Sequence, residues 1–445
     1  MANWTLPTEV ASWIAHLACL LHATHAWRLR PLLVGMLFAR GRRTVSSWLR
    51  AGELSDDYQS YYYFLGSLGC KVTSFAAIVL QAVLRVVNPG ERFLFAIDDT
   101  PTKRYGPHVQ GAGIHHNPTP GPAEQKYLYG HVWVTLSLVA RHALWGVIGL
   151  PLLAYLYVRL IDIKKIPWSY KVKFQTKLEQ AAAMVEWLAS WLKNCGKRLW
   201  VVVDGAYAKK LFLARATKAG ATIVSRLRRD AALWSVPEPV PAGQRKRGRP
   251  RKYGAERISL AKRAGHPRGW QRGTFTLYGK ETLVCYKTFL ATYKPASGLI
   301  RVVIVREQQG AWRGYFCTEP SATVAEILEA VADRSAIEQN YHDLKEVHGA
   351  GQQQLRNYWA NIAAWHLTMW LHTLIELWAW RKPHQELVDR SASPWDNADR
   401  RPSHADRRNA LRRSCLEHEY QHEADAAGFA PKTRRLWAWL LKLVA

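Results

Sequence analysis

The sequence predicts an α/β fold, in which a mixed sheet is flanked by helices and interrupted by a β-rich segment. Two apolar runs, at 92–98 and 198–205, end on acidic residues, as buried strands that lead to a ligand site do. A hairpin-like pair of runs at 129–140 and 143–153 lies between them, followed by an amphipathic helical pattern at 175–196. This order is typical of an α/β domain whose sheet is antiparallel on one side.

The chain divides by composition into five segments. Helical periodicity fills the first segment, the two acid-ending strands lie in the second, and strand-like runs such as "GLIRVVIVRE" mark the third. Long helical patterns return in the fourth, and the fifth is rich in Arg and His. The predicted boundaries are 1–90, 91–228, 229–320, 321–381 and 382–445, with short helices expected at 403–417 and 432–444.

Charge indicates the class of partner. Among 445 residues, 62 Lys and Arg stand against 34 Asp and Glu, which gives a net charge of +28. An excess of this size favours a polyanionic partner, and nucleic acid before an anionic membrane.

The six cysteines form no CxxC pair, which is typical of a reducing cytoplasm and not of a disulfide scaffold or zinc ribbon. We therefore expect a soluble cytoplasmic protein that binds no membrane.

The first segment contains a candidate DNA-binding element. Residues 41–66 read as two short helices joined by a Gly-containing turn, the pattern of a helix-turn-helix. Arg43 and Arg50 would then face the DNA backbone or a groove. The alternative interpretation is an ordinary helical hairpin with no DNA contact.

Three acids occupy positions typical of a catalytic site. Asp99, beside Asp98, follows the first core strand, and Asp204 ends the later strand "VVVDGAY". Because ligands of α/β sheets bind at strand ends, both side chains are expected in one crevice. Glu338 supplies the third acid, and clustered carboxylates repel one another unless cations neutralise them. All-oxygen ligation favours Mg²⁺ or Mn²⁺ over zinc.

Glu338 lies in a charged helical stripe. In "RSAIEQNYHDLKE", Arg334, Glu338, Tyr341 and Lys345 are spaced by four, three and four residues, which places them on one helix face. Such a stripe is either a solvated face with a salt bridge or a surface that binds phosphate beside a metal-binding carboxylate.

Further basic residues are candidates for a DNA channel. Arg226 and Arg228 follow the core strand "ATIVS", where the alternative is a solvated strand end. The segment "RKRGRPRK" (245–252) matches the core of an AT-hook, in which Arg247 and Arg249 would enter an A·T minor groove. A flexible basic linker that contacts only phosphates is the alternative.

Taken together, the blocks "AIDDT", "VVVDGAY" and "RSAIEQNYHDLKE" resemble those of bacterial insertion-sequence DDE transposases of the cut-and-paste type. The resemblance covers residues 40 to 380. It implies a ribonuclease H-like core with a β-rich insertion, an N-terminal helical DNA-binding domain, and the catalytic, metal-binding acids Asp99, Asp204 and Glu338. The family's third block carries a Tyr-Arg-Glu-Lys signature, in which Val331 stands here at the tyrosine position.

The resemblance also implies a mechanism and partners. Two Mg²⁺ or Mn²⁺ ions would be used to hydrolyse phosphodiesters at transposon ends and to join those ends to target DNA by transesterification. Arg334, Tyr341 and Lys345 would contact DNA. The partners would be terminal inverted repeats, target DNA and a second protomer, in the bacterial cytoplasm at the nucleoid. A domesticated, non-catalytic DNA-binding protein and a ribonuclease H-like nuclease without strand transfer remain as alternatives.

Overall fold

In the computed structural model, residues 4–54, 56–117, 125–238, 251–307, 310–390, 393, 395–397 and 399–427 are described, with the backbone alone for 423–427. Helices fill the first segment, as the apolar periodicity predicts: α1 (Thr8–Ala18), α2 (Ala23–Ala26), α3 (Leu29–Phe38), α4 (Val45–Ala51), α5 (Tyr58–Gly69) and α6 (Val72–Val86). The candidate helix-turn-helix corresponds to α4 and α5, joined through Gly52.

The core sheet has the strand order β4-β3-β1-β5-β6. Its antiparallel side contains β1 (Arg92–Lys103), β3 (Tyr127–His142) and β4 (Gly146–Tyr157), and its parallel side β5 (Arg198–Val203) and β6 (Thr222–Leu227). The short strand β2 (Gly113–His116) pairs with the first residues of β3. Three antiparallel strands followed by two parallel ones are the predicted ribonuclease H-like arrangement.

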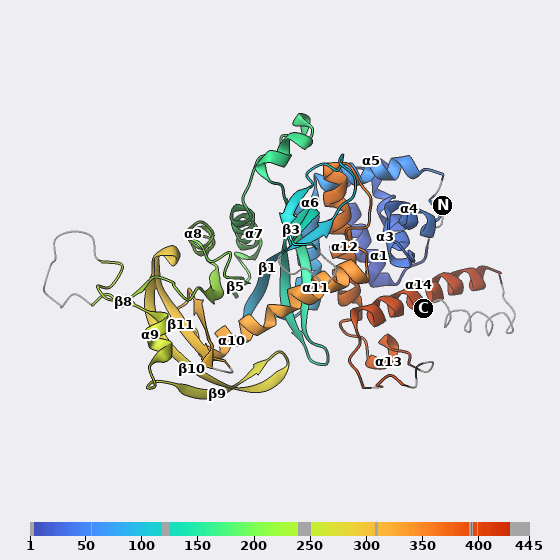
Figure 1. The fold of residues 1–445 in the computed structure, drawn as a ribbon. Coiled ribbons are helices and arrows are strands. Elements are labelled where there is room, and N and C mark those ends of the chain that lie inside the picture. Colours follow the sequence, from blue (N-terminus) through green and yellow to red (C-terminus); the bar gives the residue numbers. More distant parts are fainter. Residues whose placement is uncertain are drawn as a thin grey trace.

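Helices connect and flank these strands (Figure 1). The parallel crossovers are made by α7 (Lys177–Leu192) and α8 (Lys210–Lys218), and two 3-10 turns, η1 (Leu160–Lys165) and η2 (Trp168–Tyr170), lie between β4 and α7. A capping box fixes the start of α7, because Thr176 and Glu179 satisfy each other's backbone N–H groups.

The β-rich insertion continues the core sheet. Its elements are β7 (Leu233–Trp234), β8 (Arg257–Ile258), α9 (Leu260–Gly265), β9 (Gln271–Leu277), β10 (Lys280–Tyr293), η3 (Lys294–Ala296), β11 (Gly298–Arg306) and β12 (Trp312–Cys317). The last strand, β12, pairs antiparallel with β6, so a single twelve-stranded sheet crosses the molecule. The physical reason is that the outer edge of β6 would otherwise leave unpaired N–H and C=O groups.

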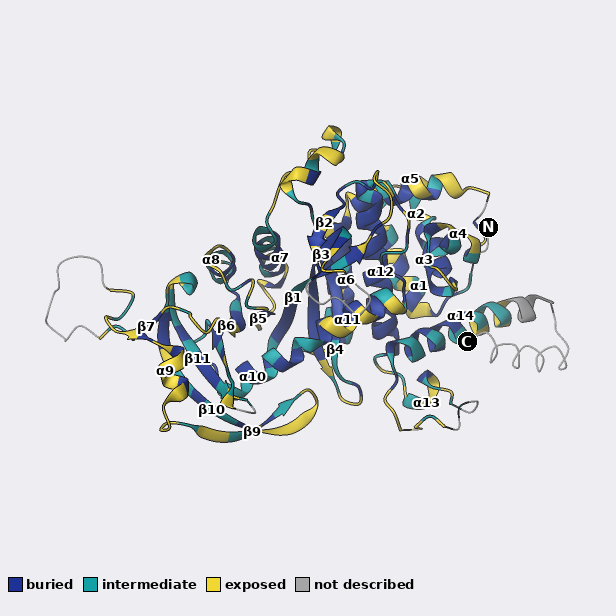
Figure 2. Cartoon of the chain, viewed as in Figure 1, coloured by how far each residue is buried: buried dark blue, intermediate teal, exposed yellow. Residues whose placement is uncertain are grey.

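Helices resume after the insertion, as predicted for residues 321–381, and continue beyond them. They are α10 (Val324–Asp333), α11 (Ser335–Glu346), α12 (Tyr358–Ala379), α13 (His384–Leu387) and α14 (His404–Ala427). The last of these is longer than the helix expected at 403–417, while the helix expected at 432–444 lies outside the described residues. All of α12 except Trp359 is buried, and the helix is dark throughout Figure 2.

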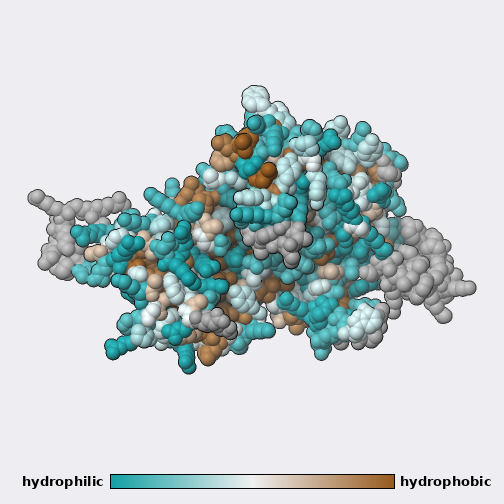
Figure 3. All heavy atoms as spheres, viewed as in Figure 1, coloured by the Kyte–Doolittle hydropathy of each residue, from teal (hydrophilic) through white to brown (hydrophobic). Residues whose placement is uncertain are grey.

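The N-terminal helices pack directly on α12. Phe75 of α6 stacks on Trp370 with 5.5 Å between ring centroids, and Gly69 of α5 lies against the carbonyl of Trp359, where a Cβ would clash. One hydrophobic cluster thus runs from Leu6 to Cys415. The face in Figure 3 is mostly hydrophilic, with scattered hydrophobic patches.

No single helix in the described ranges is both long and apolar enough to cross a membrane. The pair α5 and α6 reaches the required length and composition only in combination, with an 80° bend between the two helices.

Candidate active site

The predicted acids line one cavity of about 1080 Å³. It lies over the second half of β1, beside the end of β5 and under α11. The first strand was expected to end at its acids, but β1 continues to Lys103 because its later residues pair with β3. The charged residues at the cavity wall are Arg42, Asp98, Asp99, Lys103, Asp204, Arg334, Glu338, Lys345 and Glu346. The fold therefore brings Asp99, Asp204, Glu338, Arg334, Tyr341 and Lys345 to the same cavity, although not in equivalent roles.

Strand pleating separates Asp98 from Asp99. In the parallel pair of β1 and β5, Ile97 is opposite Val203, so the next position along each strand is Asp98 or Asp204. Opposite residues of a parallel pair point to the same face, and successive residues to opposite faces. Asp98 and Asp99 therefore point to opposite faces of the sheet, and Asp204, the first residue after β5, lies level with Asp98.

Arg334 connects Asp98 on β1 to Glu338 on α11. Its Nη1 donates to Asp98 Oδ2 at 2.6 Å, and its Nη2 donates to Glu338 Oε1 at 2.9 Å. Burial lowers the pKa of Arg334, but the charges of Asp98, Glu338 and Asp204 outweigh it and raise the pKa. One guanidinium thus lies within the field of all three carboxylates.

Burial destabilises the charged form of the Asp98 carboxylate. Burial, aided by the charge of Asp99, raises the pKa of Asp98 to about 6 against the lowering effect of Arg334. A carboxylate in this position is stabilised in its charged form by an additional cation. Asp204 is exposed, and its Oδ2 accepts from the backbone N–H of Ala206 at 3.3 Å.

Asp99, the first acid of the predicted triad, has different partners. Lys177 Nζ at the start of α7 lies 2.7 Å from Asp99 Oδ2, and the Tyr207 hydroxyl donates to Asp99 Oδ1 at 2.9 Å. Neither partner comes from α11. Sequence reasoning identified neither Lys177 nor Tyr207, because nothing local in the sequence connects them to residue 99.

The charged stripe of α11 lies across the sheet and borders the cavity. Glu338 is exposed toward the cavity, whereas Tyr341 is only 8% exposed and its hydroxyl donates to the backbone oxygen of Asp98 at 2.8 Å. This geometry corrects the DNA-contacting role predicted for Tyr341, because a buried ring with an occupied hydroxyl has no face open to a base.

The predicted basic residues fall into three groups. Arg226 and Arg228 line an adjoining cavity of about 420 Å³ together with Asp204, and Arg228 also pairs with exposed Asp230 at 3.1 Å. Arg50 is exposed on α4, and Arg43 is partly buried beside it. Arg247 and Arg249 lie outside the described residues.

Arg42, which belongs to the segment interpreted from the sequence as a helix-turn-helix, also lines the cavity. It is exposed at the cavity wall, and the next residue is tied to the opposite wall by Arg43 N–H, which donates to Gln352 Oε1 at 2.9 Å. The loop before α4 therefore borders the cavity, which only the tertiary packing of the N-terminal helices could reveal.

Comparisons with known proteins identify the family. No curated protein matches the sequence. Among solved structures, the piggyBac transposase in its synaptic complex with hairpin DNA matches with a TM-score of 0.39 and 8% identity, over 98% of this chain and 82% of the other. A family model described as DDE superfamily endonuclease matches residues 16–277, more than half of the chain. The protein thus belongs to the DDE superfamily of endonucleases, which generally use divalent metal ions.

Proposed function

We propose that this protein is a DNA transposase of an insertion sequence. It would cut transposon ends by metal-dependent phosphodiester hydrolysis and join them to target DNA by transesterification. The observation that carries this proposal is the convergence of Asp98, Asp204 and Glu338 around the guanidinium of Arg334 in one open cavity.

We assign the catalytic triad to Asp98, Asp204 and Glu338, with Asp98 in place of Asp99. Strand pleating supports this choice, and so does the Arg334 fork that connects Asp98 to Glu338. Asp99 would be a positioning residue: with Lys177 and Tyr207 it holds β1 against the start of α7 and the turn after β5.

The donor set fits the two Mg²⁺ or Mn²⁺ ions that the resemblance implies. Three carboxylates offer only oxygen ligands, and one positive group already lies among them, which indicates that a cation is stabilised there. When bound, such ions lower the pKa of an attacking water or hydroxyl and neutralise charge at the leaving oxygen.

The chain's own basic groups would position DNA. Arg42 and Lys345 at the cavity wall, and Arg226 and Arg228 beyond Asp204, can donate charge-assisted hydrogen bonds to phosphates on both sides of the scissile bond. Arg334, released from the carboxylates by bound cations, would become a further phosphate donor. The wide distribution of these basic residues is consistent with the net charge of +28.

The proposed partners are double-stranded DNA carrying the transposon's terminal inverted repeats, target DNA, and a second copy of the chain, since synapsis brings two ends together. The bacterial cytoplasm, at the nucleoid, is the corresponding location. The basic segment with Arg247 and Arg249 would add minor-groove contacts.

A cleavage and joining assay tests this function. The purified chain is incubated with end-labelled duplexes from the DNA that flanks its coding sequence, plus a supercoiled target plasmid, with Mg²⁺, Mn²⁺ or EDTA. We expect metal-dependent cuts at the repeat ends and joined products, both absent from an Asp98→Asn, Asp204→Asn, Glu338→Gln triple variant that still binds DNA.

The alternatives give other outcomes. Metal-dependent nicking without joined products would favour a nuclease. Tight DNA binding with no cleavage under any metal would favour a non-catalytic binding protein and would overturn the proposal.

A further inference from the structure

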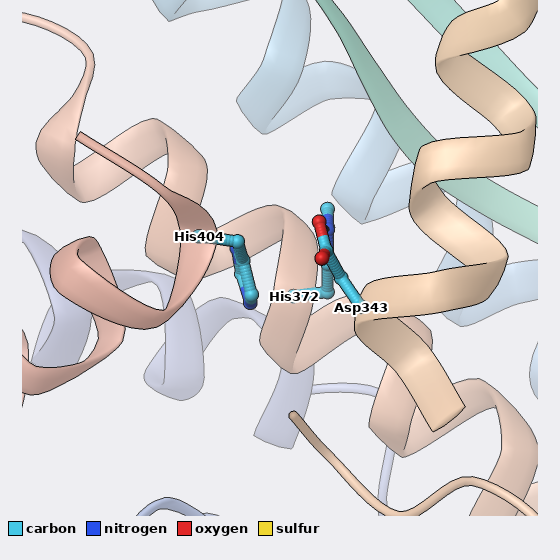
Figure 4. A group of neighbouring side chains, drawn as sticks. All are labelled: Asp343, His372 and His404. Atoms are coloured by element: carbon cyan, nitrogen blue, oxygen red, sulfur yellow. Dashed lines mark ion pairs between the residues drawn. The ribbon is translucent and has the colours of Figure 1, made fainter. Parts of the chain in front are cut away.

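A second group of potential metal ligands is buried between α11, α12 and α14 (Figure 4). Asp343 of α11, His372 of α12 and His404 at the start of α14 each offer a ligand atom, and these atoms lie within 4.8 Å of one another. His348, which follows α11, adjoins them through its Nε2, 2.7 Å from His404 Nε2. We refer to these four residues as the histidine cluster.

The histidine cluster is separate from the catalytic cavity. Glu338 and Asp343 are five residues apart on α11, which corresponds to about 7.5 Å along the axis and nearly opposite helix faces. Asp343, His372 and His404 line a different cavity, of about 430 Å³, and none of them lines the catalytic one. The two groups therefore share a helix but no ligand.

Hydrogen bonding within the protein leaves His372 unsatisfied. Its side chain is 3% exposed, and in the described part of the chain its Nδ1 has no hydrogen-bond partner. Its Nε2 lies 3.8 Å from Asp343 Oδ2, beyond hydrogen-bond length. An unpartnered polar atom that is buried in this way is destabilising, so it points to a missing ligand.

His404 has the outer partner that metal-bound histidines usually have. Its Nδ1 lies 2.5 Å from Glu376 Oε1, a carboxylate that is also paired with Arg407 at 2.8 Å. A proton held on Nδ1 by this carboxylate leaves the Nε2 lone pair directed into the cluster. Carboxylates in this position orient and strengthen histidine ligands in metalloproteins.

The donor atoms of the histidine cluster suit a divalent cation. Asp343, His348, His372 and His404 are all buried, so one carboxylate and three imidazoles are gathered away from solvent. A buried carboxylate that faces imidazole nitrogens is a common set of ligands for a transition-metal ion.

We propose that Asp343, His372 and His404, with His348 as the fourth ligand, bind a structural Zn²⁺ ion. Three imidazole nitrogens and one carboxylate oxygen form a tetrahedral set that suits zinc. Zinc bonds of about 2.0–2.1 Å require donor atoms about 3.4 Å apart. The donors of Asp343, His372 and His404, now up to 4.8 Å apart, would therefore move closer, and the Nε2 atoms of His348 and His404, now 2.7 Å apart, would separate as a ring turns. The rings of His372 and His404 are stacked at 4.0 Å, and the adjoining cavity gives room for this rotation.

Such an ion would tie three helices together. It would bind α14, which begins at His404, to α12 and to the end of α11 that follows Glu338. The zinc would therefore fix the orientation of the helix that carries the third catalytic acid without touching substrate.

Metal content of the purified full-length chain tests this inference. The protein is produced with added zinc, dialysed against metal-free buffer and measured by elemental mass spectrometry. We expect about one zinc per chain, and less than about a tenth of that in His372→Ala and His404→Ala. His366→Gln, which changes another buried histidine of α12, is the matched control and should keep the ion.

Two further measurements separate this site from the others. The Asp98→Asn, Asp204→Asn, Glu338→Gln triple variant should retain its zinc, whatever its cleavage activity. A chelator should lower the melting temperature of the wild-type chain and leave that of His404→Ala unchanged.

Wild-type protein that retains no zinc, and whose melting temperature does not respond to added Zn²⁺, would overturn the inference even if the alanine variants fail to fold. Full zinc content in His372→Ala and His404→Ala would overturn it as well, because the ion would then sit elsewhere, for example on cysteines.

Discussion

Replacing Asp98 and Asp99 separately by asparagine distinguishes the two candidates for the first acid of the catalytic triad. Each change removes one negative charge and keeps the side-chain size, so packing is preserved. The geometry predicts that Asp98→Asn abolishes metal-dependent cleavage, whereas Asp99→Asn leaves most of it. The opposite result is expected if the residue directly before Thr100 is the metal ligand.

The magnitudes follow from the contacts of each carboxylate. Loss of a metal-binding carboxylate removes several kcal/mol of transition-state stabilisation, and about 4 kcal/mol corresponds to about 10³ in rate. Asp99 pairs with Lys177, whose side chain is 36% exposed, so that ion pair contributes only about 0.5 kcal/mol. The Tyr207 hydroxyl can still donate to an asparagine oxygen. Asp99→Asn should therefore slow cleavage by less than about tenfold.

Single-turnover cleavage of an end-labelled duplex under saturating Mg²⁺ measures both rates. DNA affinity in EDTA and the melting temperature serve as controls, and both should stay near the wild-type values. If Asp98→Asn cleaves within tenfold of the wild-type rate and Asp99→Asn does not cleave, the assignment of Asp98 to the triad is refuted.

Three further outcomes follow from other contacts. Tyr341→Phe, which removes the hydroxyl that donates to Asp98 O, should cost about 1 kcal/mol in urea unfolding and leave DNA affinity unchanged; a large loss of affinity would restore a DNA-contacting role. Arg50→Ala should weaken DNA binding and reduce the salt slope by about 1 in a titration over NaCl concentration; an unchanged slope would exclude this phosphate contact. Burial lowers the pKa of His366 to about 4, below the ordinary 6.5, so the free energy of unfolding should decrease as pH drops from 6.5 toward 4. In urea unfolding experiments His366→Gln should reduce this dependence on pH; an unchanged dependence would mean that other groups cause it.

Much of the fold follows from local sequence patterns. The apolar runs that end on acids became β1 and β5, the paired runs between them became β3 and β4, and the stripe from Arg334 to Lys345 became α11 with one residue before it. Each of these elements carries its own periodicity and stop signals, which do not depend on distant partners. The order of elements then fixed the core topology.

What the sequence did not reveal depends on contacts between distant residues. Pairing of β12 with β6 joins residues about 90 positions apart, and no local pattern distinguishes it from a separate sheet. The choice between Asp98 and Asp99 requires the register of β1 against β5. The histidine cluster unites positions 343, 348, 372 and 404, which lie on different helices and connections and form no spaced motif.

The pairing between β6 and β12 has a mechanical consequence. Tyr315 of β12 lies opposite Arg226 of β6, so the insertion is joined to the wall beside Asp204 by backbone hydrogen bonds and not by a flexible tether. DNA bound to the insertion would therefore exert force on the paired strands β6 and β12. Because Asp204 lies beside these strands, that force would be transmitted to the acids, so bending of the DNA and alignment of the scissile bond would be coupled.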